Sequence, residues 1–246
     1  MSGKTIVISQ PMYFPWVGMF EQLRLADIYV DYSDVAFSKG SFTNRVQVKT
    51  PTATNWLTLP LKDLKLGQPI AEVRLDERQN WRRKHRLTLA QAHARAPFVK
   101  EMLVLVDEVM EGTGNSLAEV ANASMRVVHK YFALERPAEF YRSADLHIGG
   151  HGTQRVLAVV RHFGGTRYVT GQGATSYLDH VAFEGAGVAV DYMDYRKLEY
   201  PQSAPPFTPY VTILDLVANL GKEGRSLIVS GTRPWREIMD HKDSCS

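Results

Sequence analysis

Short apolar runs alternate along this chain with amphipathic segments, a pattern that predicts a mixed α/β protein. Near the N-terminus, Thr5–Ser9 (TIVIS) is typical of a buried strand. A short helix over Gly18–Leu25 and a second strand over Ile28–Tyr32 are expected to follow. The next apolar runs predict strands, the first two paired as a hairpin, over Arg45–Lys49, Trp56–Pro60 and Ile70–Leu75.

The middle of the chain has a helical pattern, with apolar residues spaced by three and four positions. The predicted helices cover Trp81–His93, Phe98–Glu111 and Leu117–Phe132. Ser116 followed by Glu119 is a capping-box pattern that marks the start of the third helix. We therefore expect a helical segment, residues 78–133, inserted into the α/β order.

The α/β pattern returns after this segment. Strands are predicted over Phe140–Arg142, Arg167–Thr170 and Gly187–Tyr192, and helices over Thr153–Phe163 and Val211–Leu220. A strand–helix–strand order favours a mostly parallel, Rossmann-like sheet, within one α/β domain of residues 1–230. Residues 231–246 are expected to be a polar tail, to which the sequence assigns no role.

Composition excludes several classes of protein. The 246 residues are 44% hydrophobic and 22% charged, which is typical of a globular chain rather than a disordered one. The longest apolar runs have about five residues, whereas a membrane-spanning helix needs roughly 20. The single cysteine, Cys245, excludes an internal disulfide and a cysteine-rich zinc site. We expect a cytoplasmic protein that does not associate with membranes.

The net charge of +3 is too small to indicate a nucleic acid partner, but basic residues are concentrated at the start of the first long helix. Arg78, Arg82 and Arg86 recur every four residues and would line one helical face. Trp81 and His85 share an adjacent stripe. Such a face suits the phosphates of a nucleotide or of an RNA backbone. An ordinary solvated helix surface is the alternative.

Two loops that follow predicted strands are candidate binding sites, because ligands of open α/β sheets bind beyond the carboxyl ends of the strands. Ser9–Trp16 (SQPMYFPW) holds two prolines and the polar residues Ser9, Gln10 and Tyr13; a structural corner is the alternative. Tyr168–Ala174 (YVTGQGA) holds two glycines, which let a backbone approach a ligand or simply turn.

Other reactive side chains have simpler explanations. Asp31 and Asp34 follow a strand, where an aspartate more often caps a turn than transfers a proton. His147 and His151 are separated by two glycines, which makes a metal pair on one helix face improbable. No metal site is expected. The free N–H groups at the start of the helix after Gly152 could hold an anion.

Motifs spread from Lys4 to Gly221 resemble the WbqC-like family, known from gene clusters for bacterial surface polysaccharides. The opening loop matches its pattern Gln-Pro-x-Tyr-x-Pro-Trp-x-Gly-x-Phe, here Gln10 to Phe20. Ser9 departs from it, since many members have histidine there. Further matches are Asp34, Phe37, Asn44-Arg45, Lys49, Trp56–Pro60, Asn80–His85, Ala96–Phe98, Tyr168, Gly171, Gly173-Ala174, Tyr177–Asp179, Tyr200–Gln202, Pro209 and Thr212–Leu216.

This resemblance implies an enzyme that transfers an aminoacyl group, such as glycyl, to the amine of an amino sugar or similar small acceptor, for example a nucleotide sugar. The donor would be an aminoacyl-tRNA or an ATP-derived adenylate, with no tightly bound cofactor. Such transfer needs an oriented amine, a proton acceptor and a stabilised oxyanion. The alternatives are an ATP-dependent ligase or nucleotidyl transferase of the adenylate-forming α/β superfamily, and a non-catalytic module that binds a sugar nucleotide or RNA.

The residues expected to carry this chemistry come from the same motifs. His85 is the first candidate for the proton acceptor, because an imidazole titrates near neutrality, and Asp34 is the second. Packing beside Trp81 is the alternative for His85. The loops Ser9–Trp16 and Gly171–Ala174 should line one pocket, with Trp81–His85 at its rim. Substrate binding is expected from Ser9, Gln10, Tyr13, Trp16, Asn44, Arg45, Trp81, Arg82, Lys84, Gly171, Gly173 and Tyr177.

Overall fold

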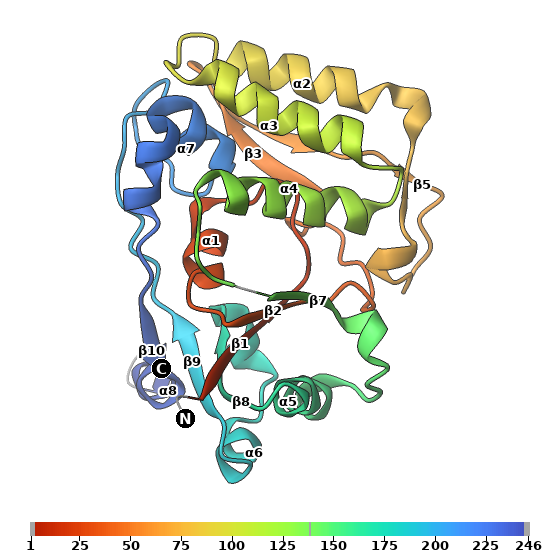
Figure 1. The fold of residues 1–246 in the computed structure, drawn as a ribbon, viewed down its shortest axis with the longest axis vertical. Helices are drawn as coiled ribbons and strands as arrows, with labels where there is room; N and C mark the ends of the chain where they lie inside the picture. Colours follow the sequence, from red (N-terminus) through yellow and green to blue (C-terminus); the bar gives the residue numbers. More distant parts are fainter. Residues whose placement is uncertain (1–2, 138, 244–246) are drawn as a thin grey trace.

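The computed structural model describes residues 3–137 and 139–243, which form a six-stranded sheet with helices on both faces (Figure 1). The strand order is β10-β9-β8-β1-β2-β7, and all neighbours pair in parallel except β10, which is antiparallel to β9. The expected α/β class with a mostly parallel sheet is therefore confirmed. The strands are Lys4–Ser9 (β1), Ile28–Asp31 (β2), Glu139–Arg142 (β7), Gly165–Thr170 (β8), Ala189–Met193 (β9) and Thr232–Pro234 (β10).

Alternation along β1 places its side chains on opposite faces of the sheet, as the two-residue period of a strand requires. Val7 joins the core that includes helix α1, Val17–Leu23. Ile6 and Ile8 join a second core, on the side of helix α5, Gly152–His162. Burial of both faces explains why the first strand is an almost continuous apolar run.

The path of the chain through the sheet changes direction once. From β1 it moves outward through β2 to β7, then returns to β8 on the other side of β1, and continues to β9. The strand order therefore reverses between β1 and β8, which we call the switch point. In open α/β sheets, the crevice outside the carboxyl ends of the strands at such a point is where ligands bind.

A layer of helices lies above the α1 face of the sheet, and α4 lies between α3 and the sheet (Figure 1). The three helices predicted for residues 78–133 are present, and α3 contacts α2, α4 and α7. Among the described residues, no helix is both long and apolar enough to cross a membrane. The remaining bounds are α2 Trp81–Ala92, α3 Val99–Gly112, α4 Leu117–Tyr131, α6 His180–Gly185 and α7 Ile213–Leu220, with the hairpin strands β3 Arg45–Lys49 and β4 Thr54–Thr58.

The prediction of one continuous strand over Ile70–Leu75 is wrong. Ile70–Glu72 is a 3₁₀ turn, and only Arg74–Leu75 (β6) is extended, paired with Leu61–Lys62 (β5). The N–H of Ile70 donates to the carbonyl of Val35, beside an isolated antiparallel bridge between Ala36 and Pro69 that does not extend into a strand. This tertiary contact, and not the local apolar run, decides the conformation.

The C-terminal segment is also more ordered than its polar composition predicts. Thr232–Pro234 adds β10 to the edge of the sheet, and α8, Trp235–Asp243, follows. Trp235 stacks on His180 with ring centroids 4.7 Å apart, and its Nε1 donates to Glu184 at 2.9 Å. A three-residue strand is too short to show a two-residue period, so the sequence pattern missed it.

Helix α2 buries the aromatic stripe that the sequence placed at the rim of a pocket. Trp81 is 1% exposed and His85 is 5% exposed. Nε2 of His85 lies 3.2 Å from the carbonyl of Thr58, which only accepts, so Nε2 carries the proton. Nδ1 then accepts from the hydroxyl of Tyr13 at 3.1 Å. Burial lowers the pKa of His85 to about 4, so the ring is neutral in the core.

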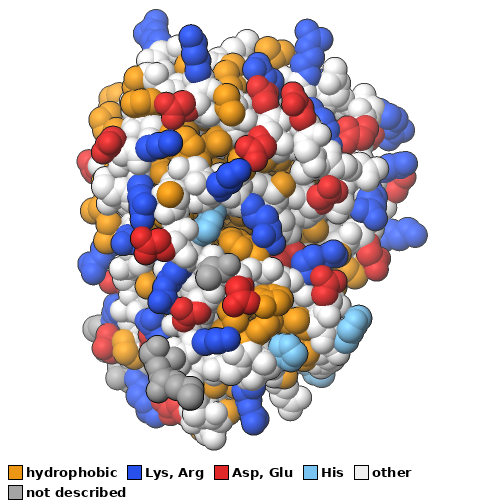
Figure 2. Space-filling model, viewed as in Figure 1, with side chains coloured by type: hydrophobic (Ala, Val, Ile, Leu, Met, Phe, Trp, Pro, Cys, Tyr) orange, Lys and Arg blue, Asp and Glu red, His pale blue; other side chains and the backbone are white. Residues whose placement is uncertain are grey.

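Arg82 and Arg86 lie on α2, whereas Arg78 lies in the 3₁₀ turn Glu77–Gln79 before it, so the predicted helical face does not include Arg78. Arg82 donates to the carbonyls of Met110 and Gly114, each at 2.6 Å, at the end of α3. There its charge also faces the negative end of the helix dipole. Arg78 and Arg86 form bidentate pairs with Asp76 and Asp107, respectively. Figure 2 accordingly shows acidic and basic side chains interspersed over the helical layer.

His85 should make folding sensitive to acid. Its lowered pKa means that its contribution to stability is present above the unfolded value of about 6.5 and is lost as the pH falls toward about 4. We expect the stability advantage of the native chain over His85→Gln to be roughly 2 kcal/mol smaller at pH 5 than at pH 7. Urea unfolding at both pH values measures this, and an unchanged difference would contradict it.

Arg82 should be a residue of stability and not of ligand binding. We expect Arg82→Ala to lower the free energy of unfolding by about 1–3 kcal/mol, since two carbonyls lose a charged donor. Lys84→Ala is the matched control, because Lys84 lies on the same helix and is exposed. Chemical denaturation compares the two variants. Equal stability would show that the contacts of Arg82 contribute nothing.

Candidate functional site

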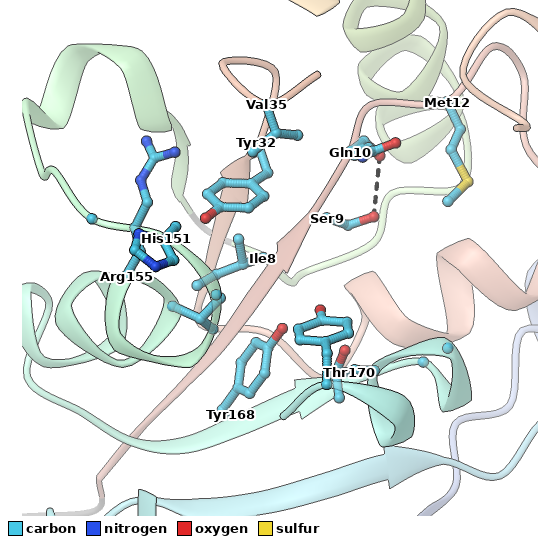
Figure 3. A pocket seen from close by; sticks show the side chains of 17 residues that line it. Ile8, Ser9, Gln10, Met12, Tyr32, Val35, His151, Arg155, Tyr168 and Thr170 are labelled. Carbon is cyan, nitrogen blue, oxygen red and sulfur yellow. Dashed lines mark hydrogen bonds between the residues drawn. The ribbon is translucent and has the colours of Figure 1, made fainter. Parts of the chain in front are cut away.

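An open cavity of about 540 Å³ lies at the switch point. Its walls come from the ends of β1 and β8, the loop after β2, and the start of α5 (Figure 3). Ser9 and Gln10 line it together with Gly171 and Gly173. The expectation that the loops Ser9–Trp16 and Gly171–Ala174 both contribute residues to one pocket is thus confirmed.

Only the first half of the opening loop faces this cavity. The second half is buried between helices: the N–H of Phe14 donates to Oγ of Ser124 at 2.8 Å, and its carbonyl accepts from Oγ1 of Thr212 at 2.8 Å. Tyr13 is wholly buried beside His85. The loop is therefore a binding candidate up to Met12 and a structural corner beyond it.

Arg155 is the cation of the cavity. Its Nε donates to the carbonyl of Ile148 at 3.1 Å, and its Nη2 binds the carboxylate of Asp34. The guanidinium carbon lies 4.9 Å from the centre of the Tyr32 ring. These three contacts hold the charged head at one place in the wall of the site.

Asp34 does not have the environment of a proton acceptor. One of its oxygens accepts from the hydroxyl of Ser143 at 2.5 Å, and the other binds Arg155. Both carboxylate oxygens therefore already have donors from other parts of the chain. The geometry supports a positioning role, in which Asp34 fixes Arg155.

The start of α5 offers free donors beside Arg155. The N-cap residue, His151, makes no side-chain capping hydrogen bond, so the first amides of the helix keep their N–H groups. Gly150 and Gly152 line the cavity with φ of 96° and 54°, in the left-handed region that favours glycine. Uncapped amides at a helix N-terminus together with an arginine form an environment that suits an anion.

Two tyrosines stand on either side of Ile8 in the floor of the cavity (Figure 3). Tyr32 follows β2 and Tyr168 comes from β8. Burial raises the pKa of both hydroxyls, which therefore stay protonated at neutral pH and can donate hydrogen bonds. Tyr177 lies at the more exposed side of the cavity.

Several expected binding residues lie elsewhere. The prediction that Trp81–His85 form the rim of this cavity is wrong, because the aromatic pair is in the core under α2 and none of the five residues lines the cavity. Asn44 donates to the carbonyl of Leu59 at 3.2 Å within the hairpin region. Arg45 stacks on Trp56, 4.1 Å from its ring centre.

Trp16 is also a packing residue. Its ring contacts Tyr195 and Tyr210, with centroids 4.7 and 5.2 Å away. It covers Gly18 so closely that a Cβ there would lie 2.2 Å from the indole. This contact explains the Trp-x-Gly spacing of the opening motif without any ligand.

Sequence reasoning identified the helix start at Gly152 as a possible anion site, but it missed Tyr32, His151 and the side chain of Arg155 as parts of the cavity. Tyr32 was predicted as the end of a strand, and the strand-end rule applied to it could have found it. Arg155 carried no such signal, because its partner Asp34 is 121 residues away in the chain.

Comparisons with known proteins agree with the motif resemblance. A model of the WbqC-like protein family matches residues 10–227. The chain is 26% identical over 223 residues to the uncharacterized protein Rv1507c of Mycobacterium tuberculosis, covering 89% of this chain and 95% of that relative. No solved structure matches. Because the family model spans most of the sequence and includes the loops of the cavity, this chain belongs to the WbqC-like family.

Proposed function

We propose that this chain is a transferase that joins an aminoacyl group, of the glycyl kind, to the amine of a small nucleotide-linked acceptor. The observation that carries the proposal is the cavity at the switch point, where Arg155 and the uncapped amides of α5 stand together. The cavity lies outside the carboxyl ends of a mostly parallel sheet, at the point where the strand order reverses, and a helix N-terminus there suits a phosphate. The reaction class comes from the resemblance to the WbqC-like family.

The side chains of the cavity suit the demands of this reaction. The amine nitrogen attacks the acyl carbon, a C–N bond forms, the bond to the carrier of the acyl group breaks, and the amine loses a proton. Arg155 and the α5 amides hold the diphosphate, and the hydroxyls of Tyr32 and Tyr168 donate to the sugar and to the oxyanion. His151 replaces His85 as proton acceptor, since it is the imidazole that lines the cavity.

An ATP-dependent ligase is the second candidate, because the same phosphate site would accept ATP. It differs in releasing AMP and pyrophosphate, with the free amino acid as acyl source. The RNA-binding alternative has less support, since Arg82 donates to backbone carbonyls at the end of α3 and Arg86 pairs with Asp107.

The activity can be tested with UDP-glucosamine and with a dTDP-linked 4-amino sugar as acceptors. Each is incubated with glycyl-tRNA, or with glycine and ATP, and mass spectrometry detects the glycyl amide. An amide formed from glycyl-tRNA without ATP supports the transferase. Formation only with ATP and with AMP release identifies the ligase. Tight binding of both nucleotides with no amide from either donor would contradict both enzymes.

Tyr168→Phe tests the cavity within that assay. Removing one hydroxyl donor should lower kcat/KM by roughly three- to tenfold, the size of one hydrogen bond, without unfolding the protein. Tyr131→Phe is the matched control, because its hydroxyl binds Glu101 on the helical layer at 2.7 Å. The same loss in both variants, or in neither, would remove Tyr168 from the site.

A further inference from the structure

A second cavity, of about 480 Å³, opens at the carboxyl ends of β2 and β7. The last residues of these strands, Asp31 and Arg142, pair in register and both line it. Asn122 and Arg126 of α4 and Arg74 of β6 form other parts of its wall. None of its lining residues lines the first cavity.

Asp31 is the buried acceptor of this second cavity. It is 3% exposed, and its Oδ2 accepts from Ser33 at 3.1 Å and from Asn122 at 2.6 Å. Its Oδ1 is buried without a hydrogen-bond partner. Burial raises the pKa of this carboxyl to about 6. A buried carboxylate oxygen without a donor is costly, so the missing donor is one that a ligand can supply.

Three arginines line the same cavity, and the acidic side chains of the described residues pair with them only weakly. Arg142 approaches Asp145 no closer than 3.9 Å, and Arg126 stacks 4.4 Å from the Phe140 ring centre. Arg74 has no side-chain partner within the described part of the chain. Guanidinium groups gathered at a cavity bind carboxylates or phosphates through paired N–H donors.

We propose that this second cavity binds a small molecule that carries a protonated amine together with an anionic group. The amine donates to Oδ1 of Asp31, and the carboxylate or phosphate binds the arginines. An ammonium is the donor that best matches an ionised, desolvated carboxylate, because a hydrogen bond between charged groups is about twice as strong as a neutral one. The site is inferred from its own lining and does not depend on the reaction proposed above.

Two matched pairs of probes test this on the full chain by isothermal titration. Glycine is compared with glycolate, and glucosamine 6-phosphate with glucose 6-phosphate, so that each pair differs by an amine against a hydroxyl. We expect one of the two amines to bind at least tenfold more tightly than its hydroxyl partner. Which pair binds shows whether the ligand is of the amino acid class or of the amino sugar phosphate class. Equal binding within both pairs, or no binding of any probe, would overturn the proposal.

Variants then locate the ligand. Asp31→Asn should remove the preference for the amine, while Arg142→Gln should weaken both members of the pair at least tenfold; Arg233→Gln, at the far edge of the sheet, is the control. If Asp31→Asn does not fold, the Arg142→Gln variant and the two probe pairs on the native chain still test whether the ligand binds in the second cavity. Binding that is lost in Arg155→Gln but kept in Arg142→Gln would place the ligand in the first cavity and contradict the proposal.

Discussion

The rest of the structure depends on the turn at Phe14, in the loop that follows the central strand β1. Phe14 is fully buried with φ of 39°, a conformation that is unfavourable for a residue other than glycine and persists only where its surroundings hold it. Ser124 of α4 satisfies its N–H, and Thr212, the N-cap of α7, satisfies its carbonyl. The same two helices are thereby docked onto the sheet, and Ser9–Met12 are held facing the cavity.

The parallel sheet gathers polar side chains along one edge, where its strands end. Four neighbouring strands, β8, β1, β2 and β7, end there in Thr170, Ser9, Asp31 and Arg142. Each carries a polar side chain at the position where its backbone leaves the ladder. The two cavities share this edge, one at the switch point and one at β2 and β7. The parallel sheet thus places both cavities beside polar side chains at the ends of its strands.

Local periodicity was enough to predict most of this architecture. Apolar spacing located the parallel strands and the three helices of the middle segment, because those elements bury one or both faces. The same reasoning placed Ser9, Gln10 and Gly171 at the end of strands, where they do line a cavity. It failed for β10, whose three residues are too few to show a period.

The failures at the site have another physical cause. Helical spacing shows that Arg82 and His85 lie on certain faces of α2, but it does not show what covers those faces. An arginine that binds the carbonyls of the next helix has the same sequence signature as one that binds a phosphate. Arg155 and Asp34 show the converse, since their pairing joins distant segments and leaves no local pattern. Tertiary contacts thus decide which polar residues are available to a ligand.

The central claim is that ligands bind at the switch point and not on the basic face of α2. Hydrogen–deuterium exchange with and without saturating uridine 5′-diphosphate tests it most directly, because one experiment measures amide exchange both at the loops of the cavity and at residues 78–86. The account predicts slower exchange at residues 150–155 and 171–177, and no change at residues 78–86. Protection at residues 78–86 with none at the two loops would contradict it.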